Sequence, residues 1–267
     1  MRKLFLCLSV LGMMLTGCSK NDDGESDNPN NNGNEQPENP NEPKLPELPA
    51  LPDPDDVCSA MDDINFMAYC YENFDVNKDG KVSVNEANAV RDINVNNQKI
   101  LSLKGIERFP NIERISGLNS PQITELDLRY NLKLQSFNCF GNKKLITVLL
   151  PNTLTSIGQS AFYSCSNLTE IHLPASLTSI GDSAFRCCDN LTEINFPDNL
   201  TSVGIYAFWN CYSLTKVACH ALVPPELNGG YSFSGQYIEN LYVPAESIQA
   251  YKDSPWARSF KNILPIE

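Results

Sequence analysis

Apolar residues recur with a period of 23 along the C-terminal half of the chain. Three consecutive segments, which start at Leu150, Leu173 and Phe196, align position for position. The repeating columns are Pro151/Pro174/Pro197, Leu154/Leu177/Leu200, Ile157/Ile180/Val203, Gly158/Gly181/Gly204, Ala161/Ala184/Ala207, Phe162/Phe185/Phe208, Cys165/Cys188/Cys211, Leu168/Leu191/Leu214 and Ile171/Ile194/Val217. A period in the low twenties is typical of a solenoid, in which each coil buries its apolar face by stacking on the next. We therefore predict an α/β solenoid, a right-handed coil with one parallel sheet.

A shorter spacing of 11 residues precedes the regular repeats. Ile112, Ile123, Leu134 and Leu145 each start a unit of the form Leu-x-x-Leu-x-Leu. Two such units make a coil of 22 residues, which can stack continuously on the coils of 23. We therefore divide the solenoid into irregular repeats at 93–149 and regular repeats at 150–218.

The regular segment reads Leu-Pro-x-x-Leu-Thr-Ser-Ile-Gly-x-x-Ala-Phe-x-x-Cys-x-x-Leu and resembles the BspA-like class of bacterial leucine-rich repeats. In the irregular repeats, Asn131 and Asn142 occupy the position where leucine-rich repeats place an amide that hydrogen-bonds the turn backbone. Residues 219–267, with Leu241 to Pro244 and Trp256, resemble the C-terminal cap of the class. The resemblance implies a surface protein that attaches to host or matrix proteins, although fold alone does not identify a ligand.

The N-terminus predicts export and lipidation. A positive start is followed by an apolar run from Leu4 to Leu15 that is too short to span a membrane, which is typical of a secretory signal. Leu15-Thr16-Gly17-Cys18 resembles the lipobox of bacterial lipoproteins, which implies cleavage after residue 17 and acyl chains on Cys18. We expect an outer-membrane lipoprotein displayed on the surface, with the periplasmic face as the alternative. Residues 18–57, rich in Pro, Asn and acidic residues, are predicted to be a disordered linker.

Residues 75–86 match the calcium-loop pattern D-x-[DN]-x-[DN]-G-x5-E at every specified position. The predicted ligands are the side chains of Asp75, Asn77, Asp79 and Glu86, the carbonyl of Lys81, and Ser83 through water. The loop resembles those of EF-hands and dockerins, and helices are expected at 63–74 and 84–91. Because no second loop follows, we interpret residues 58–92 as an EF-hand-like structural N-terminal cap that binds calcium, although a regulatory role stays open.

The charge and cysteine content of the chain limit the kinds of partner and of disulfide that we expect. A net charge of −12 argues against nucleic acid and against electrostatic binding to anionic lipid. The chain has ten cysteines, but three of them share one repeat column, where three thiols cannot all pair with each other. We interpret that column as small buried apolar residues. Cys58 and Cys70 are the only local pair that we consider for a disulfide, and whether they are bridged stays open.

Two surfaces are candidates for ligand binding. Strand alternation from Leu168 to Leu173 turns Glu170 and His172 outward. In the last regular repeat, Tyr206, Trp209 and Tyr212 replace Ser160, Tyr163 and Ser166 of the first. Exposed aromatic residues concentrated in one coil are typical of a binding hot spot. Packing beneath the C-terminal cap is the alternative interpretation, and the one that we favour.

The sequence does not predict an enzyme. Its only two histidines, His172 and His220, have no accompanying nucleophile, although a pair of carboxylates acting as a hydrolase is an alternative. We predict a non-enzymatic, monomeric surface lipoprotein that binds an extracellular protein or other macromolecule. The second hypothesis is a glycan-binding accessory lipoprotein of a nutrient-uptake system.

Overall fold

The computed structural model of the chain describes residues 45–96, 99–118, 122–229, 231–235 and 238–266. They belong to one compact unit that begins at Leu45. The predicted signal peptide, the lipidated Cys18 and most of the predicted linker lie outside the described residues. Within the described residues, no helix has the length and apolar character needed to cross a membrane.

Short helices open the described unit. They are η1 (Val57–Ala60), α1 (Ile64–Phe74) and α2 (Val84–Ala89). Asp63 caps α1 by accepting from the amides of Asn65 and Phe66. Ser83 and Glu86 form a capping box at the start of α2. The two helices expected on either side of the calcium loop are therefore present.

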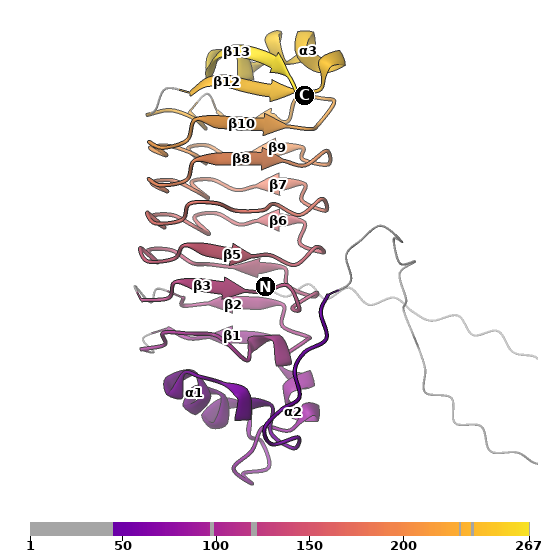
Figure 1. The fold of residues 1–267 in the computed structure, drawn as a ribbon, viewed down its shortest axis with the longest axis vertical. Helices are drawn as coiled ribbons and strands as arrows, with labels where there is room; N and C mark the ends of the chain where they lie inside the picture. The colour runs from indigo at the N-terminus through magenta and orange to yellow at the C-terminus, as the bar shows by residue number, and fades with distance from the viewer. Residues whose placement is uncertain (1–44, 97–98, 119–121, 230, 236–237, 267) are drawn as a thin grey trace, which may run out of the picture. The chain divides into compact units, whose positions relative to one another are not determined.

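Parallel strands follow, one after another, as successive coils (Figure 1). They are β1 (Asp92–Asn94), β2 (Arg114–Ser116), β3 (Glu125–Asp127), β4 (Ser136–Phe137), β5 (Thr147–Leu149), β6 (Ser156–Ile157), β7 (Ser179–Ile180), β8 (Glu193–Phe196), β9 (Ser202–Val203), β10 (Lys216–Cys219), β11 (Glu226–Leu227), β12 (Ile238–Val243) and β13 (Phe260–Pro265). The one helical turn between strands in the early coils is η2 (Ile106–Arg108). The predicted solenoid is confirmed.

The strands of the described residues divide among four parallel sheets rather than joining in one. Their orders are β1-β2-β4, β3-β5, β6-β7-β9-β11 and β8-β10-β12-β13. The second and third regular coils each contribute to two sheets, through β7 and β8 and through β9 and β10, because the two short strands of a coil lie on different sides of it. A single sheet was expected because the sequence pattern marks apolar positions but not the side of the coil on which each strand lies.

The sequence period sets the register of the regular repeats. Ile157 pairs with Ile180, and Ile180 pairs with Val203, so equivalent residues of successive coils lie side by side. Phe162, Phe185 and Phe208 are fully buried, and their rings stack at 5.1 and 5.0 Å between centroids. Burying each such side chain contributes about 1.5–3 kcal/mol, so this phenylalanine column is a major part of the core.

The cysteine column lies beside it. Cys165, Cys188 and Cys211 are buried and unbridged, as the sequence predicts. Each thiol also donates to a backbone carbonyl of the preceding coil, at 3.1 to 3.2 Å. Cys58 and Cys70 are both free and buried. A hydrogen bond with Cys58 and burial raise the pKa of the Cys70 thiol, so the two side chains are in contact.

Buried asparagines connect the irregular coils. The amide of Asn131 donates to the carbonyls of Ile106 and Phe109 at 3.0 and 3.1 Å. Asn142 donates to the carbonyl of Leu118 in the preceding coil, and to that of Cys139 in its own turn at 2.8 Å. These are the turn hydrogen bonds that the resemblance to leucine-rich repeats implies.

The far end of the solenoid is covered by β12 and β13 with η3 (Ala245–Ser247), α3 (Ile248–Lys252) and η4 (Pro255–Arg258). Trp256 is fully buried, and its indole donates to the carbonyl of Pro225 at 2.8 Å. The hydroxyl of Tyr251 donates to the carbonyl of Ala221 at 2.9 Å. The cap therefore covers the last coil with apolar rings while satisfying their polar atoms.

The N-terminal segment differs from its prediction. Residues 45–57, assigned to a disordered linker, belong to the compact unit. Leu51 packs against the core, the hydroxyl of Tyr130 donates to the carbonyl of Pro46 at 2.9 Å, and the guanidinium of Arg108 donates to Pro49. Any linker therefore ends before Leu45, and the proline-rich segment after it lies against the solenoid.

Candidate functional site

The acidic loop between α1 and α2 is folded around its own side-chain oxygens. Asp75 accepts from the amides of Asp79 and Gly80 at 3.2 and 3.0 Å. The amide of Asp79 is also 2.9 Å from the side-chain oxygen of Asn77. Glu86 closes the loop by accepting from the amide of Val76 at 2.8 Å. Gly80 has a φ of 87°, which other residues adopt only with strain, so the glycine of the pattern is required by the turn.

The donor chemistry of this loop fits a calcium ion. It offers hard oxygens from three carboxylates, one amide and the Lys81 carbonyl within one short segment. Hydrogen bonds from the backbone and hydroxyl of Ser83 lower the pKa of Glu86 to about 2, so this carboxylate is charged at neutral pH. In the described residues no three acidic, thiol or imidazole groups converge as a ready metal cluster. The carboxylates bond to loop amides instead.

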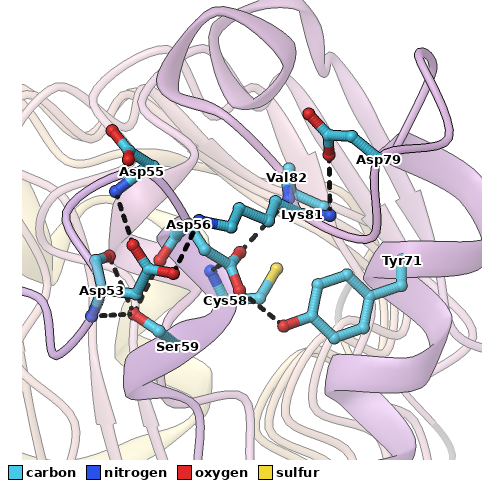
Figure 2. A network of polar contacts seen from close by, with 9 residues as sticks. All are labelled: Asp53, Asp55, Asp56, Cys58, Ser59, Tyr71, Asp79, Lys81 and Val82. Atoms are coloured by element: carbon cyan, nitrogen blue, oxygen red, sulfur yellow. Dashed lines mark hydrogen bonds and ion pairs between the residues drawn. The ribbon is translucent and has the colours of Figure 1, made fainter.

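A buried carboxylate connects the loop to the chain that precedes it (Figure 2). Asp56 accepts from the amides of Cys58 and Val82 at 3.0 and 3.2 Å, and from the hydroxyl of Tyr71 at 2.6 Å. The amide of Val57 donates to the carbonyl of Val82 at 2.9 Å. Burial and this carboxylate raise the pKa of Tyr71. The segment before η1 therefore pairs with the centre of the loop.

The same contact extends to the side chains on the surface. Lys81 forms an ion pair with Asp53 at 2.9 Å. Asp53 also accepts from the amide of Asp55 at 3.0 Å. Figure 2 shows Lys81 reaching across from the loop to Asp53. The loop, η1 and α1 thus form one connected unit at the N-terminal end of the solenoid.

A second cluster runs along the regular repeats. Phe140, Tyr163, Arg186 and Trp209 are spaced by 23 residues, and we call them the Arg186 column. The rings of Phe140 and Tyr163 stack at 5.1 Å between centroids. The guanidinium carbon of Arg186 lies 5.4 Å from the ring centroid of Tyr163 and 4.3 Å from that of Trp209. The cation is therefore held between two aromatic rings from the neighbouring coils.

Within the described part of the chain, no carboxylate neutralises the charge of Arg186. Its Nε is buried and has no hydrogen-bond partner. Buried polar groups normally have a hydrogen-bond partner, and this chain has an excess of acidic residues that could supply one, with a net charge of −12. The lack of a partner for Arg186 therefore suggests that a bound ligand supplies it.

Tyr206 adds a third ring to this cluster. Its centroid is 5.8 Å from the Arg186 guanidinium carbon and 5.7 Å from the ring of Tyr231, on which it stacks. The backbone of Tyr206 has a φ of 57°, a conformation that is uncommon for bulky residues and costs about 1–2 kcal/mol. The equivalent residues, Ser160 and Ser183, share that conformation with small side chains.

The three aromatic residues singled out in the sequence have different surroundings. Tyr206 is covered in part by Tyr231 of the segment leading to the cap, Trp209 stacks on Arg186, and Tyr212 is 63 % exposed. The core side of the cap takes Phe233 and Trp256 instead, against Phe196. Packing beneath the cap therefore describes Tyr206 only.

The second candidate surface, the strand face that carries Glu170 and His172, contains no comparable cluster. Glu170 and His172 are exposed and lie 3.1 Å apart, but their segment forms no strand, unlike the equivalent β8 and β10. Glu193 and Lys216 occupy the position of Glu170 in the next two coils, and they form an ion pair at 3.2 Å. These residues belong to other columns than Arg186 and contact one another. The structure therefore does not join them to the aromatic cluster.

Sequence reasoning missed Arg186, Tyr163 and Phe140 as members of this cluster. The signal was present, because all three share the 23-residue column of Trp209. We overlooked it because an arginine interrupts the row of aromatic residues.

One hollow lies elsewhere, between the proline-rich segment and the irregular coils. Its volume is about 370 Å³, and it is lined by Leu48, Pro49, Lys104, Arg129 and Tyr130 among others. Burial opposes ionisation of Asp127 on its wall, but the hydrogen bonds from Arg129 hold the pKa of Asp127 below its usual value. Asp127 and Arg129, two of the charged residues that line this hollow, thus pair with each other.

Comparison with known families gives one match. Residues 119–259 match the model described as BspA type leucine rich repeat region, in six copies. No curated protein matches the chain.

Solved structures similar to this chain are leucine-rich-repeat proteins. One from T. pallidum is 26 % identical over 40 % of this chain and 46 % of its own, with a TM-score of 0.33. One from Bacteroides ovatus is 20 % identical over 51 % of this chain and 48 % of its own, with a TM-score of 0.38. A leucine rich cell surface protein from Faecalibacterium prausnitzii is 17 % identical over 52 % and 54 %, with a TM-score of 0.34. The chain spans about half the length of these proteins.

Proposed function

The chain belongs to the BspA-type leucine-rich-repeat family, and from that premise we propose that it is a cell-surface binding protein without catalytic activity. Its ligand is an extracellular macromolecule, and the Arg186 column is the surface that engages it. The observation that carries this assignment is an unneutralised guanidinium stacked between Tyr163 and Trp209 at the surface of successive coils.

Two physical arguments favour this column over the strand face. Trp, Tyr and Arg are the residue types that dominate binding energy in protein interfaces, because they combine a large contact area with directed polar atoms. Tyr206 places a third ring beside Arg186 from a left-handed turn position where the other two regular coils have a serine. Glu170 and His172 offer neither feature, since they already pair with each other.

Display at the surface depends on the lipid anchor proposed at Cys18. Buried acyl chains contribute about 0.8 kcal/mol per methylene group, so several chains hold a protein on a membrane stably. The residues between Cys18 and Leu45 would serve as the linker that gives the solenoid its reach. Attachment to the outer membrane with the solenoid facing outward is part of this proposal.

Calcium would serve as a structural element of the N-terminal cap. Asp75, Asn77, Asp79, Lys81, Ser83 and Glu86 are the residues that would hold it. A bound divalent cation would offset the repulsion among the acidic groups of this loop and fix its shape. Asp56 and Val57 support a structural role, because they bond both backbone polar groups of Val82 at the centre of the loop. Asp56 accepts from the amide of Val82, and the amide of Val57 donates to the carbonyl of Val82.

A glycan-binding accessory lipoprotein of a nutrient-uptake system is the second candidate. The flat, partly exposed rings of Tyr163 and Trp209 favour it, since aromatic faces are common platforms for ligand rings. The two candidates differ in ligand, not in the surface used.

The test is an array of extracellular matrix proteins and polysaccharides probed with the purified full-length protein. We expect binding to at least one member, and we expect Trp209→Ala to lower that affinity by tenfold or more. Val223→Ala, which truncates a side chain that is 78 % exposed, is the control and should bind as wild type does. Full binding by Trp209→Ala, or no binding by wild type anywhere on the array, would contradict the proposal.

A further inference from the structure

We infer that the Arg186 column is a binding site for carboxylated sugars, the uronic acids of acidic polysaccharides. This inference rests on the proposed function and names the ligand class of the same surface. It joins two chemistries that the column holds side by side, a cation without a protein partner and flat aromatic rings on either side of it.

The guanidinium indicates a carboxylate. Arginine presents its donors in a planar fork that matches two carboxylate oxygens, and such bonds are about twice as strong as neutral ones. The rings of Tyr163 and Trp209 lie against the guanidinium of Arg186, whose side chain is half-buried. Its Nε is buried without a hydrogen-bond partner, so a carboxylate would meet the terminal nitrogens of the guanidinium.

The aromatic residues indicate a sugar ring. One face of a pyranose consists largely of C–H groups, which pack against the face of an aromatic ring as other apolar groups do. Phe140 and Tyr231 extend the aromatic surface beyond the arginine at either end, and they are 47 % and 56 % exposed. A chain of sugar residues that carry a carboxylate could therefore cover several coils.

Charge excludes more highly charged ligands. The column contains one cation, and the chain as a whole has a net charge of −12. Polymers with a dense array of sulfate or phosphate groups need clustered Lys and Arg, and they would be repelled by this protein. A short acidic oligomer that presents one carboxylate to the column matches its single arginine flanked by aromatic rings.

An acidic peptide fits less well. Peptides are recognised at a free sheet edge, in an apolar groove or by a cluster of arginines. The apolar hollow beside Leu48 and Pro49 is lined by none of the column residues. A single arginine between exposed rings therefore favours a sugar acid, and binding of an acidic peptide instead is an outcome that the experiment can detect.

The experiment is calorimetric titration of the full-length protein with three probes. They are oligogalacturonate, glucuronate-containing hyaluronan oligomers, and carboxyl-reduced oligogalacturonate, which keeps the rings and loses the charge. We expect wild type to bind at least one acidic oligomer, and to bind the reduced oligomer at least tenfold more weakly than oligogalacturonate. Arg186→Gln should bind oligogalacturonate more weakly than wild type by the same factor, and it should bind the reduced oligomer as wild type does. The reason is that the substitution in the protein and the reduction of the ligand remove the same interaction.

Controls separate this inference from the proposed function. Trp209→Ala should weaken both acid and reduced oligomers, whereas His172→Ala should change neither. Equal affinity of wild type for acidic and reduced oligomers, or binding of poly-glutamate in preference to both acids, would overturn the inference and leave the binding function standing. No binding of either acidic oligomer by a protein that binds another array member would also overturn it. Because the comparison of oligomers uses wild type, it does not depend on the folding of Arg186→Gln.

Discussion

Individual side chains in the coils combine apolar burial with one hydrogen bond to the preceding coil. Burial raises the pKa of Cys165 and Cys211 to about 12, and that of Cys188 well above its usual value. Neutral thiols that donate to backbone carbonyls react slowly with electrophiles, because the thiolate is the reactive form. Cys187, the neighbour of Cys188, is partly exposed at the surface.

Alkylation should therefore distinguish two adjacent cysteines. Brief treatment of the native protein with iodoacetamide near pH 8 is expected to modify Cys187 and spare Cys188, as read by peptide mapping with fragmentation. Treatment in denaturant should modify both and serves as the control. Equal labelling of the two residues in the native protein would show that the cysteine column is not packed as described.

Asn131 carries a larger share of stability than a surface asparagine. Asn131→Ala would leave the carbonyls of Ile106 and Phe109 buried without their donor. We expect a loss of about 1–3 kcal/mol in the free energy of unfolding, measured by urea denaturation. Asn199→Ala removes a similar bond to Ala175 at an exposed position and should cost less than about 0.5 kcal/mol. Equal effects would contradict this assignment.

The residues of the solenoid were predictable to different degrees. Columns of identical apolar residues, such as the one at Phe185, follow from period alone because each coil imposes the same environment. The clustering of Arg186 with aromatic rings follows less directly from the sequence, since its column holds a different residue in each coil and its contacts depend on Tyr163 and Trp209 lying on either side. The sequence records their spacing but not the orientation of their rings.

Among the elements, the proline-rich N-terminal segment is one for which composition gave the wrong prediction, because it is part of the compact unit. Residues 45–52 contain three prolines and were predicted to be disordered for that reason. Leu45, Leu48 and Leu51 are three residues apart, which places them on one face of an extended polyproline-type chain with three residues per turn. Leu48 and Leu51 are partly buried, whereas Leu45 and Pro49 are exposed. The apolar spacing decides the packing here.

The acidic loop connects three elements, because it lies between α1 and α2 and bonds to the start of η1. Calcium bound in this loop would therefore stabilise all three. We predict that calcium raises the melting temperature of the full-length protein and that a chelator reverses the rise. A ligand that binds the folded state alone stabilises it by about 2.7 kcal/mol at a hundredfold excess over its Kd. Melting followed by circular dichroism measures the shift.

Variants test whether the loop causes that shift. Glu86→Gln removes the charge of the closing residue and should abolish most of the calcium effect. Glu246→Gln, an exposed change in the C-terminal cap, should leave the calcium effect intact. A calcium shift of the same size in Glu86→Gln would remove the loop as the calcium site.

The unit that begins at Leu45 is a stack in which every coil depends on its neighbours, with the acidic module at one end and the Trp256 cap at the other. Stability in such arrays is a sum of coil and interface contributions, so a change at one end is transmitted only as far as the coils cooperate. Both tryptophans of the chain, Trp209 and Trp256, lie in the last coils and the cap. Their fluorescence therefore reports the end farthest from the acidic module.

The central claim is that the aromatic and arginine column, rather than the strand face, meets the ligand. Hydroxyl-radical footprinting of the full-length protein, with and without a macromolecule that it binds, tests this claim most directly. We predict that ligand protects Phe140, Tyr163 and Trp209 from oxidation and leaves His172 as reactive as in the free protein. Protection of His172 with unchanged oxidation of Trp209 would contradict the account.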